Sequence, residues 1–344
     1  LKAKNYPAGS HIAICSKNCA HWIMADLAIW MAGHVSIPLY PNLNNATVTK
    51  ILDHSESKLC FLGKLDDWKE IQKGIPKDMP LIAFPYEPRE NSESWDDLIS
   101  KHEPIQGEVT RKMDEVCTII YTSGTTGDPK GVVHNFISPS YAGTNVVRDL
   151  GINPSDRFFS YLPLAHVAER LLCETSPLYG GSTVSFAESL ATFPTNVQET
   201  EPTIFLAVPR LWTKFKQKIL LKMPQKKLDV LLKIPVLNNV IRKKIKTGLG
   251  VNKARIVGTG AAAIPESLLI WFDKLGIHIG DCYAMTENYA FSYVSRPESI
   301  KIGWAGQPLS GVDVKINDGG EVLIKSKADL TGYFKNKEET DSIF

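Results

Sequence analysis

Short apolar segments alternate with amphipathic segments along most of the chain. An apolar run of about four to eight residues is typical of a buried strand, and apolar positions three or four apart indicate a helix. The predicted strands are residues 11–16, 35–40, 59–62, 116–121, 157–162, 183–186, 204–207 and 255–258, and the apolar run 276–280 is also strand-like. The clearest predicted helices are 19–33 and 44–54. This order predicts an α/β fold in which mostly parallel sheets are covered by helices.

The alternation is interrupted twice. Residues 64–110 are polar and in places rich in proline, which predicts a connector with one or two helices. Two alternating segments, 312–316 and 321–326, flank Asn317-Asp318-Gly319-Gly320, which is a hairpin signal. The predicted units are a first α/β subdomain at 1–110, a second at 111–290, and the start of a small β subdomain at 291–344.

Composition is that of an ordinary globular protein. Of the 344 residues, 43% are hydrophobic and 22% are charged, and the net charge of +2 gives no general argument for nucleic acid. The six cysteines are scattered without a Cys-x-x-Cys pair, as expected for reduced thiols in a cytosol. The most apolar stretch, Trp22 to Gly33, contains Asp26 and is too short to span a bilayer. With no signal-peptide pattern, these features predict a cytoplasmic protein.

The strongest candidate for chemistry is a loop that follows the predicted strand 116–121. The stretch from Tyr121 to Val132 reads Tyr-Thr-Ser-Gly-Thr-Thr-Gly-Asp-Pro-Lys-Gly-Val. Its glycines allow positive φ, so that successive backbone N–H groups can form an anion nest, and its hydroxyls add uncharged donors. Lys130 supplies a positive charge for a phosphate. The loop is not a Walker motif, in which Lys follows Gly directly, and its composition predicts a polyphosphate site, most simply for ATP.

Four other segments carry candidate site residues, each with a structural alternative. The Thr286-Glu287 pair offers a hydroxyl and a carboxylate for Mg²⁺, or caps a surface helix, and Tyr283 before it can stack on a purine. The turn of small residues from Gly260 to Ala262 lets backbone approach a flat ligand, or is simply tight. His166 by itself is a structural hydrogen-bonding residue or a catalytic group, and Trp212 by itself is a core aromatic.

Residues 213–253 form a basic stretch with helical periodicity. The segment has twelve Lys or Arg residues against one acid, Asp229, which is a local charge of +11. Such a stretch can lie on an anionic membrane surface, form a solvated face over core helices, or attract the phosphates of coenzyme A. All three interpretations stay open on the sequence.

The loop 121–132 resembles, position for position, the phosphate-loop signature of the adenylate-forming superfamily. Four further segments resemble motifs of its acyl-CoA synthetases, in the same order, over essentially the whole chain. They are the Gly-Ala-Ala turn at 260–262, Leu-Pro-Leu-x-His-x-x-Glu-Arg at 162–170, Tyr-x-x-Thr-Glu at 283–287, and Gly-Glu-Val to Gly-Tyr-Phe-Lys-Asn at 320–336. Two residues depart from the family, because Cys282 and Ala284 stand where Gly is usual. Trp212, in a Val-Pro-x-x-Trp context, resembles the gate of the fatty-acid tunnel in long-chain members.

The resemblance implies a fold, a reaction and roles for the residues. The fold would be the acetyl-CoA synthetase-like N-terminal domain, and the enzyme would be a long-chain-fatty-acid–CoA ligase using ATP, Mg²⁺ and coenzyme A. The phosphates would be held by Thr122, Ser123, Gly124, Thr125, Thr126, Gly127 and Lys130. The adenine would lie against Gly260, Ala261, Ala262 and Tyr283, and Mg²⁺ would be bound by Thr286 and Glu287. Lys130, His166 and Glu287 would be the catalytic residues, and Trp212 the acyl gate.

The family pattern also implies what lies outside the chain. A ribose-binding Thr-Gly-Asp motif, a hinge and a C-terminal lobe would follow Phe344, and further residues would precede Leu1. We therefore expect most of a large N-terminal domain that turns over poorly by itself. The alternatives are a fatty-acyl-AMP ligase or luciferase-like enzyme, and a catalytically silent lipid- or nucleotide-binding domain. A homodimer and peripheral membrane contact through residues 213–253 are left open as partners.

Overall fold

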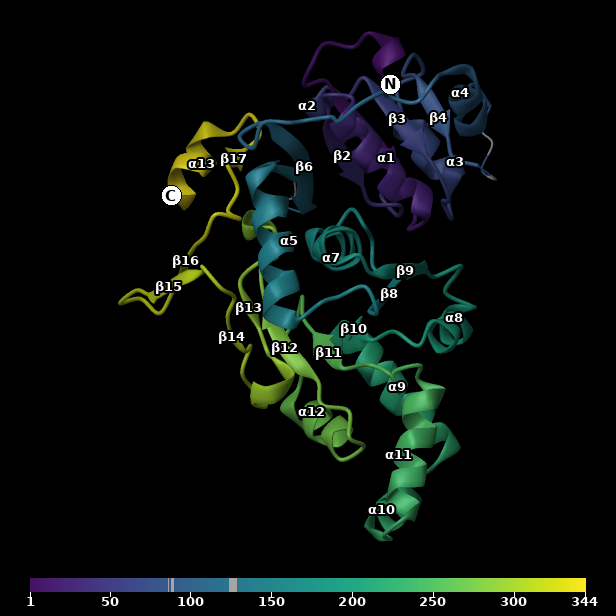
Figure 1. Ribbon diagram of the computed structural model, residues 1–344, viewed down its shortest axis with the longest axis vertical. Helices are drawn as coiled ribbons and strands as arrows, with labels where there is room; N and C mark the ends of the chain where they lie inside the picture. The colour runs from purple at the N-terminus through teal and green to yellow at the C-terminus, as the bar shows by residue number, and fades with distance from the viewer. Residues whose placement is uncertain (86, 88–89, 124–128) are drawn as a thin grey trace.

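The computed structural model describes residues 1–85, 87, 90–123 and 129–344. Most of these residues are organised around two sheets, which lie one above the other along the long axis of the molecule (Figure 1). Both termini lie in the upper half, close to the first sheet. The mixed α/β architecture predicted from the alternation is confirmed.

The first sheet is parallel over most of its width and has an antiparallel edge. In spatial order its described strands are β17 (Gly332–Tyr333), β7 (Pro129–Asn135), β6 (Val116–Ser123), β2 (Val35–Leu39), β1 (His11–Cys15), β3 (Leu59–Leu62), β4 (Leu81–Ala83) and β5 (Glu93–Ser94). Its helices are α1 (Ala20–Met31), α2 (Asn45–Ser55), α3 (Trp68–Ile71) and α4 (Trp95–Lys101), with short 3₁₀ turns at Lys2–Lys4 and Gln72–Gly74.

Alternation along β1 explains why helices cover both faces of this sheet. Successive side chains of a strand point to opposite faces. Ile12 and Ile14 pack in the cluster that contains the buried residues of α1, whereas Ala13 and Cys15 pack in the cluster that contains those of α2. Because both faces are covered, every residue of β1 after the first is buried, and its sequence is a continuous apolar run.

The second sheet has a parallel centre and an antiparallel edge. In spatial order its described strands are β14 (Gln307–Pro308), β13 (Tyr293–Val294), β12 (Gly280–Tyr283), β11 (Ile256–Thr259), β10 (Ile204–Leu206), β8 (Arg157–Ser160) and β9 (Thr183–Phe186). The helices that follow β7 and lie between these strands are α5 (Ile137–Leu150), α6 (Val167–Arg170), the π-helical Leu171–Thr175, α7 (Ser176–Gly180), α8 (Phe193–Thr200), α9 (Pro209–Lys222), α10 (Gln225–Lys233), α11 (Leu237–Gly248) and α12 (Glu266–Asp273).

The remaining elements complete the C-terminal part. The 3₁₀ turns Thr286–Asn288 and Pro297–Ser299 lie between the last strands of the second sheet, and α13 (Lys337–Ile343) follows β17. The predicted hairpin is confirmed, because β15 (Asp313–Ile316) pairs antiparallel with β16 (Val322–Lys325) across the Asn-Asp-Gly-Gly turn.

Three expectations about local structure are corrected. Strands β6 and β7, assigned to the second subdomain, belong to the first sheet, because β6 pairs with β2 and the hairpin brings β7 to the other side of β6. Lys130 and Val132, placed in the loop, lie in β7. The apolar run 276–280 was expected as a strand, but the strand begins at Gly280 and the isoleucines before it fill the core. The division into units at 1–110, 111–290 and 291–344 otherwise stays a prediction.

A buried ion pair joins the two halves of the molecule. Arg170, at the end of α6, pairs with Asp26 of α1, and its Nη1 donates to Oγ1 of Thr118 in β6 over 2.8 Å. The Asp26 and Arg170 side chains are fully buried. Glu174 accepts from Nε of Arg170 at 3.1 Å; its burial raises its pKa far above the ordinary value, and the nearby Asp26 raises it further. The Glu174 carboxyl therefore favours its protonated form, and Arg170 neutralises the buried carboxylate of Asp26.

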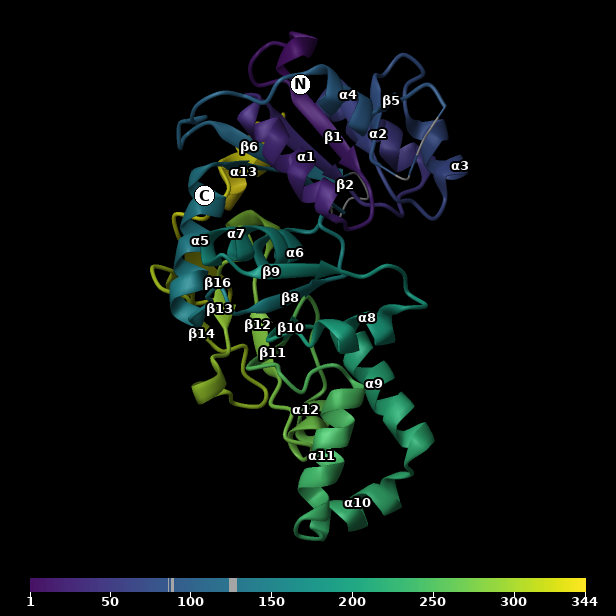
Figure 2. The same ribbon diagram turned by 45° about the vertical axis from the view of Figure 1, so that its right-hand side comes forward.

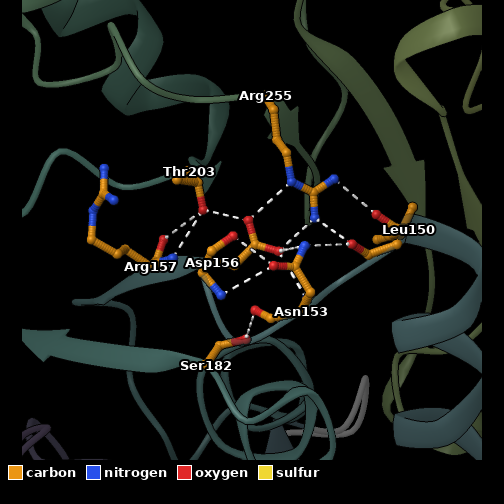
Figure 3. Close-up of polar contacts among 9 residues, drawn as sticks. Leu150, Asn153, Asp156, Arg157, Ser182, Thr203 and Arg255 are labelled. Atoms are coloured by element: carbon orange, nitrogen blue, oxygen red, sulfur yellow. Dashed lines mark hydrogen bonds and ion pairs between the residues drawn. The ribbon is translucent and has the colours of Figure 1, made fainter.

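A second polar cluster ties together the starts of strands in the second sheet (Figure 3). Asp156 accepts from Nε of Arg255 at 2.9 Å and from its Nη2 at 2.6 Å, and from Oγ1 of Thr203 at 2.7 Å. The same guanidinium donates to the carbonyl oxygens of Leu150 and Gly151. This cluster lies at the amino ends of β8, β10 and β11, so that the opposite, carboxyl ends are left for a ligand.

Candidate active site

The glycine-rich loop is the connection of a β-hairpin. β6 ends at Ser123 and β7 begins at Pro129, with Thr122 opposite Lys130 in the antiparallel register. Gly124, Thr125, Thr126 and Gly127, which the sequence predicts to hold phosphate, lie outside the described residues, as does the side chain of Ser123. The described stem therefore brings Thr122 and Lys130 to the mouth of the loop from opposite strands.

Lys130 meets a partner that the sequence did not predict. Its ammonium group forms an ion pair with Glu339 of α13, and it lies 5.9 Å from the centre of the Tyr333 ring. Asn336 caps the same helix by accepting from the backbone N–H of Glu339 at 3.1 Å. No motif carried by a single segment could have revealed the pair, because it joins two elements that are distant along the chain.

The Thr286-Glu287 pair lies in a 3₁₀ turn that is held by three hydrogen bonds, one of them from the hairpin. The phenol of Tyr333 donates to Oε1 of Glu287 at 2.8 Å, and the backbone N–H of Leu330 donates to the Glu287 carbonyl at 2.6 Å. Nε2 of His134, in β7, bonds to the Thr286 carbonyl at 2.8 Å. Because Tyr333 also pairs with Val132 in the sheet, the structure brings both Glu287 and Lys130 to this one tyrosine.

His134 is a site residue that sequence reasoning missed. Its side chain is fully buried, and burial lowers the pKa of the imidazole to about 4. The neutral ring must carry its proton on Nε2, because a carbonyl oxygen can only accept. Nδ1 is buried and has no hydrogen-bond partner among the described residues. The ring meets Tyr289 edge to face at 5.2 Å. A signal was available, since a histidine stands among apolar residues of a buried strand.

The second sheet brings the small-residue turn beside Tyr283. Strands β11 and β12 pair in parallel, with Thr259 opposite Asp281, so that the turn from Gly260 and the residues Cys282 and Tyr283 leave the sheet at the same edge. A Cβ on Gly260 would lie 2.8 Å from Sγ of Cys282, which requires glycine at this position. Ala261 has a φ of 65°, in the left-handed region, and the alanines of the turn are exposed.

Cys282 stands where the family usually has glycine. Its thiol donates to the Thr259 carbonyl at 2.7 Å, and burial raises its pKa to about 12, with the nearby Asp281 adding to the effect. The sulfur therefore stays a neutral thiol that packs against the start of the turn. Tyr283, in contrast, is 43% exposed and presents its ring at the surface of the turn.

His166 and Trp212 have other contacts. His166 caps α6, because its Nδ1 accepts from the N–H of Ala168 at 3.2 Å, and burial lowers its pKa. Trp212 is completely buried in the core of the second half, with its ring centre 5.1 Å from that of Phe272, and its Nε1 donates to the Gly258 carbonyl at 3.3 Å. Trp212 thus packs against β11, the strand that leads to the Gly260 turn.

A cavity of about 610 Å³ opens beside the hairpin stem. Its lining includes Lys130 and Tyr333 from the candidate site, together with Tyr121 of β6 and His54 of α2. Nδ1 of His54 is bonded to the Tyr121 hydroxyl at 2.8 Å, which fixes this wall. The cavity provides room next to Lys130 for a charged group.

The chemistry of the donor set fits Mg²⁺ when phosphate is present. Mg²⁺ takes oxygen ligands and is commonly held by one or two protein side chains together with phosphate oxygens and water. Thr286 and Glu287 offer a hydroxyl and a carboxylate next to the phosphate hairpin. Among the described residues, no group of three or more His, Cys, Asp and Glu side chains is arranged to hold a metal ion.

Comparison with known proteins identifies the family. The two-sheet fold with a glycine-rich hairpin defines the adenylate-forming class of α/β proteins, and a model of this class described as AMP-binding enzyme matches residues 1–334. The chain belongs to that family. It is 28% identical to long chain acyl-CoA synthetase 5 of Arabidopsis thaliana over 402 residues, covering 100% of this chain and 60% of the relative. It is 26% identical to long-chain-fatty-acid–CoA ligase 5 of Rattus norvegicus, covering 96% and 56%.

Solved structures share the fold. The anthranilate CoA ligase AuaEII in complex with anthranoyl-AMP has a TM-score of 0.79 at 21% identity, covering 99% of this chain and 64% of that one. The N-terminal domain of FACL13 from Mycobacterium tuberculosis has a TM-score of 0.76 at 24% identity, covering 99% and 82%. The chain spans less than two thirds of the curated relatives it matches, so that the fold corresponds to their N-terminal domain.

Proposed function

We propose that the protein activates a long-chain fatty acid with ATP, forming acyl-AMP and then acyl-CoA. In the first step a carboxylate oxygen attacks the α-phosphorus of ATP, and the bond to pyrophosphate breaks. In the second step the thiolate of coenzyme A attacks the acyl carbon, and AMP leaves. The observation that carries the proposal is the Tyr333 bridge, which places the phosphate hairpin and the Thr286-Glu287 turn side by side.

The chain's own residues act by binding and by charge neutralisation, which dominate phosphoryl and adenylyl transfer. Lys130 exchanges its Glu339 partner for phosphate oxygen, and Thr122 and the loop residues Ser123 to Gly127 donate hydrogen bonds. The adenine lies between the Gly260-Ala261-Ala262 turn and Tyr283, because both leave the second sheet at one edge. His166 orients the acyl carboxylate as a neutral donor, consistent with its lowered pKa.

Thr286 and Glu287 would hold Mg²⁺, which supplies charge neutralisation to the phosphates when bound. Tyr333 keeps the Glu287 carboxylate pointing at the hairpin by donating to one of its oxygens. The other carboxylate oxygen would then stay available as a ligand for Mg²⁺.

The long-chain substrate class is supported by the printed names of the relatives and by Trp212. In this proposal the acyl chain passes beside β11, next to the Trp212 side chain that packs there, and rotation of this side chain would open the apolar core of the second half. A cytoplasmic location accompanies this proposal. Within the described part of the chain, none of the helices is both long enough and apolar enough to cross a bilayer.

Calorimetric titration with non-hydrolysable acyl-AMP analogues tests the function. We compare hexadecanoyl, hexanoyl and benzoyl analogues on the wild-type protein. Lys130→Gln and its matched control Lys335→Gln are used with an ATP analogue; Lys335 lines the same cavity but pairs with Glu56. We expect the hexadecanoyl analogue to bind most tightly. Tighter binding of the benzoyl analogue would overturn the substrate class and leave adenylate formation standing.

Lys130→Gln is assayed separately with a non-hydrolysable ATP analogue, because acyl-AMP lacks the pyrophosphate. We expect about a tenfold loss for Lys130→Gln and less than a twofold change for the control. No binding of any analogue would favour a silent domain. Acyl-AMP that accumulates in the presence of coenzyme A would favour a fatty-acyl-AMP ligase.

A further inference from the structure

Helices α9, α10 and α11 project from the second half of the molecule as a helical arm. In both views the arm extends away from the sheets, with α10 at its far end and α11 returning alongside (Figures 1 and 2). The arm is held at one side, because Nε1 of Trp271 in α12 donates to Oε1 of Gln225 at 2.8 Å and Nε of Arg242 donates to the Lys274 carbonyl at 3.1 Å. Leu228 is buried in the core of this half.

The far end of the arm exposes branched apolar side chains. Val236, in the connection between α10 and α11, is 75% exposed, and Leu221 at the end of α9 is 85% exposed. The other exposed apolar residues of the tip are Val230, Ile234, Leu237 and Val240. Single exposed apolar residues are ordinary on a protein surface, whereas six within twenty residues of chain need a reason (221 to 240).

The backbone at the tip is also unusual. Val236 has a φ of 70°, in the left-handed region. A β-branched residue rarely adopts this conformation, because its side chain clashes with the backbone. The fold therefore holds an apolar side chain outward in a position where glycine would cost less.

Exposed lysines share the helix faces that carry these apolar residues. Residues three or four apart lie on the same face of a helix. Val230 of α10 is thus flanked by Lys226, Lys227 and Lys233, and Val240 of α11 by Lys243 and Lys244, all of them exposed. The one acid of the segment, Asp229, accepts from Nε2 of Gln225 at 2.7 Å.

We propose that the tip of this arm, residues 221–244, docks on the surface of an anionic lipid bilayer. The valines and leucines enter the boundary between headgroups and acyl chains, and the lysines contact anionic headgroups. The proposal does not depend on adenylate chemistry.

Two other occupants fit the tip less well. A free polyphosphate such as coenzyme A would use the lysines but not the exposed aliphatic residues, and in both views the tip lies at the opposite end of the molecule from β6. Protein interfaces are typically rich in aromatic anchors, and residues 221–248 contain no Phe, Tyr or Trp.

Co-sedimentation with vesicles tests the docking surface. Vesicles of phosphatidylcholine alone are compared with vesicles that contain about 30% phosphatidylserine, a content chosen to give a clear negative surface potential. The charge variant is Lys226→Gln/Lys227→Gln, and its matched control of equal net charge is Lys101→Gln/Lys112→Gln, two exposed lysines in the first half. The apolar variant is Val236→Gly/Val240→Ser, in which glycine suits the positive φ. Thermal unfolding of each variant verifies folding.

We expect wild-type protein to bind only the phosphatidylserine vesicles, and the charge variant to lose about 25-fold in affinity, roughly fivefold for each lysine. The matched control should stay within twofold, and the apolar variant should lose at least fivefold. Equal losses in the two lysine variants would overturn the proposal, because they would report net charge alone. Unchanged binding of the apolar variant would also overturn it and would indicate a soluble polyanion site. Titration of acyl-AMP analogues in the same variants should be unaltered, which separates this result from the proposed function.

Discussion

The hydroxyl of Tyr333 donates a hydrogen bond to Oε1 of Glu287 over 2.8 Å, and the same ring faces Lys130. The bridge depends on the pairing of β17 with β7, which brings a residue near the C-terminal end of the chain to the phosphate hairpin. Two candidate groups of opposite charge are thereby positioned by one neutral side chain. Burial raises the pKa of Tyr333, and the Glu287 carboxylate raises it further, so the phenol remains a donor.

Tyr333→Phe removes this donor and keeps the ring. A hydrogen bond to a charged group contributes about 1.5–3 kcal/mol, so we expect binding of a non-hydrolysable ATP analogue to weaken about tenfold in the presence of Mg²⁺. Without Mg²⁺ the loss should shrink to less than threefold. Calorimetry provides both values, and Tyr179→Phe, at an exposed tyrosine of α7, is the matched control. Equal losses with and without Mg²⁺ would contradict a role in positioning Glu287.

His134→Phe tests the link between β7 and the Thr286 carbonyl. The aromatic ring should keep the packing against Tyr289, but the Thr286 carbonyl loses the histidine donor and keeps only the N–H of Tyr289 at 3.1 Å, so we expect a loss of about 0.5–1.5 kcal/mol. Urea denaturation measures this cost near pH 7. A change below about 0.5 kcal/mol would show that the hydrogen bond does not hold the turn.

The protonation of His134 also makes stability depend on pH. The pKa is lowered to about 4 in the folded state from about 6.5 in the unfolded chain, so the unfolded chain binds more protons between these values. This contribution to stability therefore rises as the pH increases from about 4 to about 6.5. His134→Phe should remove the rise.

Glu169 contributes in the opposite direction. It is buried and accepts from Oγ of Ser160 at 2.8 Å and from the Tyr161 N–H at 3.0 Å; burial nevertheless raises its pKa to about 7. The folded state holds a proton that the unfolded chain releases above about pH 4.5, so stability falls from there to about pH 7. Glu169→Gln, which keeps a neutral acceptor, should abolish the fall.

The two opposed contributions give a comparison within one experiment. Free energies of unfolding at several pH values between about 4.5 and 6.5 should change little for the wild type, increase with pH for Glu169→Gln, and decrease for His134→Phe. Parallel curves for the three proteins would contradict both assignments.

The cluster of Asp156 and Arg255 should contribute strongly to stability. Burial by itself would raise the pKa of Asp156, but hydrogen bonds from Arg255 and Thr203 outweigh it, and the pKa lies below its ordinary value. Asp156→Ala removes the carboxylate that accepts from Arg255 and Thr203, while the partly exposed guanidinium keeps the Leu150 and Gly151 carbonyl oxygens, and we expect a loss of about 1–2 kcal/mol in thermal or urea unfolding. The control is Arg148→Ala, which breaks the ion pair of this exposed arginine with Asp149 at 3.4 Å. It should cost less than about 1 kcal/mol.

Acid should remove the contribution of Asp156. Because its folded pKa is depressed, the stabilisation is present above the unfolded pKa of about 3.9 and is lost as the pH falls through the folded value. Asp156→Asn should therefore be less sensitive to acid than the wild type below about pH 4. An unchanged acid transition would argue against the ion pair.

Trp212→Phe addresses the acyl gate. The substitution removes the hydrogen bond to the Gly258 carbonyl and shortens the side chain, and we expect about 1–3 kcal/mol of destabilisation with a changed preference among acyl-AMP analogues. Trp271→Phe is the control, because Trp271 belongs to the same cluster but bonds to Gln225. If both variants alter chain-length preference equally, Trp212 is a core residue and not a gate.

Local patterns in the sequence were sufficient for the α/β architecture, the β15–β16 hairpin and the phosphate-loop motif. Strand alternation, glycine content and turn residues act over a few neighbouring positions, so they can be read without the rest of the chain. The buried runs of β1 and β2 are examples, because strands covered on both faces need apolar residues throughout.

Tertiary structure alone decided which distant residues meet. The ion pair of Lys130 with Glu339, the bond of Tyr333 to Glu287, and the bond of His134 to Thr286 join residues that are 209, 46 and 152 positions apart along the chain. Sheet order produces these contacts, because pairing of β7 with β6 on one side and β17 on the other cannot be deduced from the composition of any one strand. The sequence by itself therefore determined the elements and their chemistry, and the packing of the sheet edge decided the geometry of the candidate site.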